Sequence, residues 1–347
     1  NYIAISAIER NRGNYTEAES HLQKALAIVK HAYGETHPWI GSDYQKLAEL
    51  YRIQKKYQQS DEAIESGIQA LARPTVSMET ADIPYQQVVD LQILLSLVVE
   101  KATLLQAVHA DNLPEDLQLL RTALGHYQEA DLLFDRIRRA YTSESSKVLL
   151  QKNATTVYEK AIRLCQSLYA HTDSTKYLEL ALKFSEKSKA TVLAETLQAS
   201  TLTQIQGIPL EVLQELNNLN QKIRLAKQKL SDDPSDTLKS REVFTLMRQY
   251  DSLANHIASM YPQYYNLKYN LKVASAREIQ ERLSDTQAVL SYVEGDSAWY
   301  IFCLTSLFIS LNEVAKQDLL VADLARFREA VSSSSSDYQE LAKESFQ

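Results

Sequence analysis

The sequence predicts a mainly α-helical protein: a solenoid of stacked antiparallel helix pairs, then a long helical hairpin, then the first strands and helix of a truncated α/β domain. Three observations predict this fold. Seven glycines and seven prolines in 347 residues are few, which favours long helices with few tight turns. Apolar residues recur at helical spacing through most of the chain. Only a segment near the carboxyl end is rich in β-branched and aromatic residues.

The clearest repeat lies between Gly13 and Pro38, where a turn precedes a helix whose small and apolar residues share one face. Those residues are Ala18, Leu22, Ala25 and Leu26. Placing Tyr15 over Tyr57 gives an offset of 42 residues, and the same offset sets Ile5 over Leu47. Two adjacent repeats are therefore visible, and we expect their helices at 2–12 and 15–32, then at 40–54 and 57–72.

This period, with the ending ALAIVKHAYGETHP, resembles the long tetratricopeptide repeat (TPR) units of kinesin light chains and many bacterial TPR proteins. The resemblance implies a right-handed solenoid with a concave face lined by the first helix of each pair. Further helices are expected at 85–109, 114–141, 143–169 and 175–198. The repeat region then spans 1–200, with pairs at 1–38, 39–73, 85–141 and 143–199.

Two heptad-like seams follow in a region at 207–265, on either side of a turn from Asp232 to Asp236. The apolar positions are Val212, Leu216, Leu219, Ile223, Ala226 and Leu230 in one helix, and Val243, Met247, Tyr250, Ala254, Ile257 and Tyr261 in the other. Spacings of three and four predict an antiparallel coiled-coil hairpin.

The last region, 271–347, changes character and is expected to be the incomplete start of an α/β domain. We predict a short helix at 275–283, strands at 288–293, 298–305 and 307–311, and a helix at 315–331. Glu294 to Ser297 supply the turn of a β-hairpin.

The order of these regions resembles that of bacterial CHAT proteins, in which a caspase-like domain follows TPR repeats. The resemblance rests on ALKFSEKSKATVLAETL, on YPQYYNLKY at the hairpin's end, and on REIQERLSDTQAVLSYVEGDSAWYIFCLT. It implies cysteine peptidase chemistry by a His/Cys dyad. Cys303 falls in the entry hairpin, where that family has no nucleophile, so no catalytic residue is expected here and this portion is expected to be inactive. Two alternatives stay open for the full-length protein: a caspase-like cysteine peptidase, or a scaffold or signalling adaptor with a degenerate peptidase-like domain.

Composition excludes several other classes. The net charge is −7, and no basic stripe suggests nucleic acid as a partner. Cys165 and Cys303 are too far apart in sequence for a disulfide framework, which favours a reducing, cytoplasmic compartment. The sequence has no phosphate-binding glycine motif, so no cofactor is expected. It also has no cluster of residues with the spacing of metal ligands, so no metal is expected. No apolar run of about 18 residues indicates a membrane. The start at Asn1, inside a helix, suggests a fragment whose targeting signal would lie upstream.

The remaining candidate is a protein- or peptide-binding surface on the concave face. The TPR register places Ile3, Ala7 and Arg10 there in the first repeat, and Gln45, Glu49 and Arg52 in the second. We take Arg10, Gln45, Glu49 and Arg52 as the candidate binding residues, able to hold an extended peptide or a helix. The alternative, that they are ordinary solvated helix positions, stays open, as does the oligomeric state.

Overall fold

The computed structural model describes residues 2–71, 88, 90–112, 116–140, 144–189, 209–232, 237–261, 273–296 and 298–316. By their contacts, the residues divide into two compact units, which are described separately. One contains 1–134, 153–189 and 274–347, and the other contains 135–152 and 190–273.

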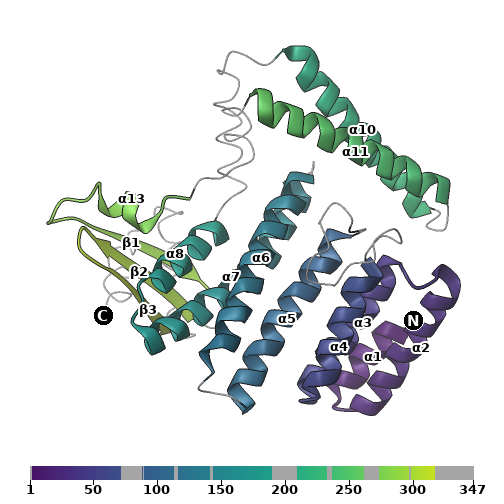
Figure 1. Ribbon diagram of the computed structural model, residues 1–347, viewed down its shortest axis with the longest axis horizontal. Helices are drawn as coiled ribbons and strands as arrows, with labels where there is room; N and C mark the ends of the chain where they lie inside the picture. Colours follow the sequence, from purple (N-terminus) through teal and green to yellow (C-terminus); the bar gives the residue numbers. More distant parts are fainter. Residues whose placement is uncertain are drawn as a thin grey trace, which may run out of the picture. The chain divides into compact units, whose positions relative to one another are not determined.

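Helices dominate the first unit, as predicted (Figure 1). They are α1 (Tyr2–Asn11), α2 (Tyr15–Tyr33), α3 (Pro38–Ile53), α4 (Tyr57–Leu71), α5 (Leu91–Asn112), α6 (Leu117–Ala140), α7 (Glu144–Thr172) and α8 (Lys176–Ser188), with the end of α6 and the start of α7 falling in the second unit. Helix α3 packs against α2, α4 and α5. Most residues chosen from the repeat pattern lie in the core: Ala18, Leu22 and Ala25 of α2 and Leu47 of α3 are buried. Leu26 is only half-buried, and Ile5 is exposed.

The turns inside the first two pairs confirm the 42-residue offset. Gly13 has a φ of 82°, and Lys55, its equivalent one repeat later, has a φ of 60°. Both residues therefore reverse the chain in the left-handed region, which glycine adopts freely and lysine does not. The two pairs share a turn geometry although only one of them carries the residue suited to it.

Helix α5 begins later than the sequence predicted. The N–H groups of Gln92 and Ile93 donate to Oδ1 of Asp90, over 2.8 and 3.1 Å. An aspartate in this place caps the helix and defines its first turn. The predicted start at residue 85 is therefore wrong, because Val88 and Asp90 are not helical.

From Leu91 to Asp111, α5 is long and apolar enough to cross a membrane by length and composition, the one such stretch in the described ranges. We did not expect such a stretch from the sequence. Here it packs against α3 and α4. Its charged residues all form ion pairs: Glu100 and Lys101 with neighbouring helices, and Asp111 with Lys55 in the turn before α4. These are the contacts of a helix in a repeat core.

The carboxyl-terminal part of this unit contains helix α13 (Ala276–Gln280) and strands β1 (Ala288–Glu294), β2 (Ala298–Thr305) and β3 (Ile309–Ala315). Within the described residues, the strands form an antiparallel sheet in the order β1-β2-β3, with Cys303 opposite both Leu290 and Ser310. Helix α8 packs against β1 and β3.

Strand β3 starts two residues after its predicted start at Leu307. The hydroxyl of Thr305 accepts from the N–H groups of Leu307 and Phe308, which holds these residues in the turn. Ala315 ends this strand, so the helix predicted from 315 does not begin there, and the rest of it, 317–331, lies outside the described residues. Helix α8 ends at Ser188, and Lys189 is extended, so the helix predicted at 175–198 stops earlier than expected. Residues 190–198 lie outside the described residues.

The second unit contains α10 (Leu210–Asp232) and α11 (Thr237–Met260), which lie side by side (Figure 1). Leu216 and Ile257, one from each predicted seam, are buried between partly buried neighbours that include Val212 and Tyr250. Residues 233–236, most of the predicted turn, lie outside the described residues.

Candidate functional site

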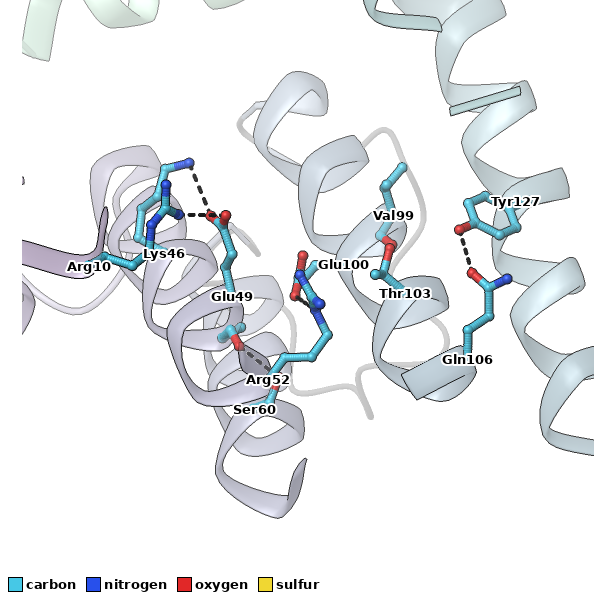
Figure 2. Close-up of polar contacts among 11 residues, drawn as sticks. Arg10, Lys46, Glu49, Arg52, Ser60, Val99, Glu100, Thr103, Gln106 and Tyr127 are labelled. Atoms are coloured by element: carbon cyan, nitrogen blue, oxygen red, sulfur yellow. Dashed lines mark hydrogen bonds and ion pairs between the residues drawn. The ribbon is translucent and has the colours of Figure 1, made fainter. Parts of the chain in front are cut away.

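The candidate residues lie on α1 and α3, and two of them bind each other. Nη1 of Arg10 is 2.6 Å from Oε1 of Glu49, which joins the first helix of one pair to the first helix of the next (Figure 2). Nζ of Lys46 is 3.7 Å from the other Glu49 oxygen. Gln45 is half-buried one turn before Glu49. The structure therefore pairs two of the residues that the sequence suggested as ligand-binding groups.

Arg52 pairs with α5, the first helix of the next pair. Its Nε donates to Oε1 of Glu100 on α5 over 2.6 Å (Figure 2). Glu100 is only 8% exposed, and burial raises the pKa of its carboxyl group, an effect that the charge and hydrogen bond of Arg52 oppose. A buried carboxylate needs such a partner, because an isolated charge is costly away from water.

We call Arg10, Gln45, Lys46, Glu49, Arg52 and Glu100 the first-helix face. On this face an arginine recurs at the same repeat position, Arg10 and then Arg52, and each pairs with a glutamate on the next first helix. Sequence reasoning missed Lys46 and Glu100. The repeat pattern could not have found Glu100, because the separation of Arg10 from Glu49, 39 residues, leads from Arg52 to Leu91. The two ion pairs link the three successive first helices α1, α3 and α5.

The polar contacts continue at α5 and α6. The hydroxyl of Tyr127 donates to Oε1 of Gln106 over 2.8 Å (Figure 2). Burial raises the pKa of Tyr127 to about 12. Tyr127 is therefore a neutral hydrogen-bond donor at physiological pH.

A second polar cluster is buried among α6, α7 and α8. Oδ1 of Asp131 accepts from the hydroxyl of Tyr158 over 2.9 Å and from Nζ of Lys187 over 2.7 Å. Nζ of Lys183 lies 3.5 Å from the other oxygen. This carboxylate is compensated by charge and hydrogen bonds together, the condition under which buried ion pairs are tolerated.

A third cluster, which we call the sheet contact, joins α7 to the β1–β2 turn. The carboxylate of Glu159 accepts from the backbone N–H of Asp296 over 2.6 Å and from the hydroxyl of Tyr300 over 3.2 Å. A Cβ at Gly295 would collide with this carboxylate. Arg163, one turn further along α7, pairs with Glu313 of β3 at 3.3 Å. The sheet is thus attached to a solenoid helix through specific polar bonds.

Nucleophilic chemistry finds little support in the described part of the chain. Burial raises the pKa of the Cys165 thiol, so this sulfur stays protonated and unreactive. Cys303 is half-buried in the middle of β2. No group of three or more His, Cys, Asp and Glu residues that could hold a metal ion occurs among the residues searched, which are the described ones.

Comparison with known protein families gives a match in the first repeats. Residues 2–73 match the tetratricopeptide repeat family. The chain therefore contains TPR repeats. The matched segment covers α1 to α4 and contains Arg10, Gln45, Glu49 and Arg52. No curated protein matches the chain. TPR repeats generally mediate protein–protein interaction, which agrees with the expected binding role.

Proposed function

We propose that this chain is the recognition part of a CHAT-type cysteine peptidase, with a protein or peptide partner bound on the first-helix face and the catalytic residues outside this sequence. One observation carries the binding half of the proposal. The TPR match contains all four binding candidates, and these lie on the first helices of the two repeats. First helices line the surface that TPR arrays use for ligands.

The peptidase half is supported by the resemblance of the carboxyl-terminal regions to CHAT proteins and by the sheet contact. A helical hairpin precedes an antiparallel β-hairpin, the order on which the resemblance rests. Glu159 of α7 bonds to the turn of that β-hairpin. A domain begun by this sheet would have a defined attachment to the last described helices of the array.

The binding half is tested by exchanging charges within one ion pair. The double variant Arg10→Glu/Glu49→Arg can re-form the pair with reversed signs, so the fold is kept while the presented charges change. Peptides selected from a displayed random library against the unmodified chain should bind this variant about tenfold or more weakly, the loss expected when a charged contact is removed.

A matched control reverses Arg277 and Glu281, an exposed pair on the short helix and its cap, 2.9 Å apart. Peptide affinity should not change in this control. Equal affinity for the unmodified chain and the Arg10→Glu/Glu49→Arg variant would refute binding at the first-helix face.

The inactivity of this portion is tested with casein. We expect no time-dependent cleavage on incubation with the purified chain. Cleavage that Cys303→Ala abolishes would show that the nucleophile lies on β2. For the full-length parent, casein cleavage would support the peptidase assignment, and its absence under the same conditions would favour an adaptor with a degenerate domain.

A further inference from the structure

The turn between α2 and α3 is closed by a histidine at a position where helix caps usually supply an oxygen. His37 is extended, precedes Pro38 at the start of α3, and its Nδ1 accepts from the backbone N–H of Trp39 over 3.2 Å. Most caps are Ser, Thr, Asp or Asn, whose oxygens accept throughout the neutral and mildly acidic range. A histidine Nδ1 accepts only while the ring is neutral. The first turn of α3 therefore depends on the protonation state of one side chain.

Aromatic neighbours from both repeats hold this ring in place. Tyr33, the last residue of α2, stacks on His37 with the ring centres 4.4 Å apart. Trp39 of α3 meets both rings edge-on at 5.2 Å. The imidazole thus contacts the last helix of the first repeat and the first helix of the second. Burial lowers its pKa, because a charge is costly away from water.

The ionisable groups of α2 and α3 near this turn supply no free negative charge for a protonated His37. Glu35, the carboxylate of the turn, is paired with Nζ of Lys30 at 2.6 Å. His31, in the last turn of α2, is exposed and is itself a base. The first carboxylate of α3 is Asp43, and burial raises the pKa of that group to about 6, which favours its neutral form.

The other helices that pack against α3 add no stronger partner within the described residues. Helix α4 has no charged residue in its last turn. At the start of α5, Oδ1 of Asp90 accepts from two N–H groups of its own helix. The N-terminus of α3 itself disfavours a positive charge. Protonation of His37 is therefore opposed by burial and by the helix dipole, and it removes the acceptor of the capping N–H.

We propose that His37 is an acid-sensitive latch at the junction of the first two repeats: the neutral ring closes the first turn of α3, and protonation opens it. A folded-state pKa below the ordinary value of 6.5 gives a stabilisation that is fully present above about pH 6.5. It is lost as the pH falls through the folded-state pKa. Because Tyr33 and Trp39 meet at this ring, opening it loosens the packing between α2 and α3. The latch needs no ligand and is independent of peptide binding on the first-helix face.

The proposal is tested with isotope-labelled tryptophan in a Trp299→Phe background, which leaves Trp39 as the single tryptophan of the chain. NMR measures solvent exchange of the Trp39 backbone N–H between about pH 8 and pH 5, a range that spans histidine titration. Each rate is divided by that of an unprotected amide at the same pH. This protection should fall about fivefold or more as the pH is lowered, the factor that corresponds to one lost hydrogen bond. The midpoint of the fall should lie below pH 6.5.

Matched variants separate His37 from its neighbours. His37→Asn supplies a cap oxygen across this pH range, so the protection of Trp39 should stay constant. His31→Asn removes the exposed histidine of α2 and should leave the fall in protection unchanged. If His37→Asn does not fold by circular dichroism, His37→Ser takes its place, because serine caps with a hydroxyl. Constant protection in the chain that keeps His37, or the same fall in the folded His37 variant, overturns the proposal.

Discussion

Replacing Asp43 should make the stability of the repeat region depend less on pH. Asp43 lies on the buried side of α3, is 1% exposed, and has one side-chain oxygen without a hydrogen-bond partner. Burial raises the pKa of this carboxyl group from its ordinary 3.8 to about 6. The protonated form is therefore favoured in the folded state.

The sign and size follow from linkage between protonation and folding. A folded-state pKa above the unfolded value gives a contribution that is fully present below about pH 4 and is lost as the pH rises through about 6. The pKa rises by about 2, and each pKa unit corresponds to ~1.36 kcal/mol, so the free energy of unfolding falls by ~3 kcal/mol. The Asp43→Asn variant has no ionisable side chain at this position, so it should not show this pH-dependent loss of stability. Its unfolding free energy relative to the unmodified chain should rise by ~3 kcal/mol between about pH 4 and pH 7.

Tryptophan fluorescence can follow the unfolding of the repeat region. The chain has two tryptophans. Trp39 lies four residues before Asp43 on the same helix, so urea unfolding is monitored in a Trp299→Phe background. Comparison across pH matters more than the difference at any one pH, because the asparagine amide brings its own unsatisfied donors. Glu62→Gln removes an exposed carboxylate from α4 and should give a nearly constant difference. A constant difference for Asp43→Asn as well would refute the argument.

Three further predictions concern the turn, the sheet contact and the first-helix face. Lys55→Gly should have a higher thermal midpoint than Lys55→Ala, because both variants lose the ion pair of Lys55 with Asp111 but only glycine accepts a φ of 60° without strain; a lower midpoint for the glycine variant would contradict this. Gly295→Ala should destabilise the hairpin by ~1–3 kcal/mol through overpacking against Glu159. Hydrogen exchange of the β1–β2 turn measures this, and the effect should shrink in a Glu159→Ala background. Arg52→Gln should cost ~2–3 kcal/mol in urea unfolding, below the ~3–5 kcal/mol of a fully buried pair because Arg52 remains partly exposed. Glu100→Gln in that variant should recover part of the loss, and no recovery would show that the pair is not the cause.

Local patterns predicted the elements well where one repeat could be compared with the next. The offset that sets Tyr15 over Tyr57 located α1 to α4, and it set Leu22 over Ile64, both of which are buried. It could not locate the start of α5, because the cap at Asp90 outweighs the apolar pattern that runs back toward residue 85.

The site was harder to predict, since pairing is a tertiary property. Periodicity placed Arg10 and Arg52 on the correct helices, but which carboxylate each one meets depends on how far successive helices are displaced. The sequence separations of the two pairs differ, 39 residues for Arg10 and Glu49 and 48 for Arg52 and Glu100. The partnership of Glu159 with the β1–β2 turn spans 137 residues and had no local signal.

The two arginine pairs also bear on the mechanics of the array. Each one spans two successive first helices and so acts as a restraint on the opening of that side when the superhelix is stretched or bent. The restraints differ in their response to ionic strength. In the Arg10–Glu49 pair both side chains are about a quarter exposed. In the Arg52–Glu100 pair the side chain of Glu100 is only 9% exposed. Salt screens exposed charges far more than buried ones. Raising the salt concentration should therefore weaken the restraint between α1 and α3 more than the restraint between α3 and α5.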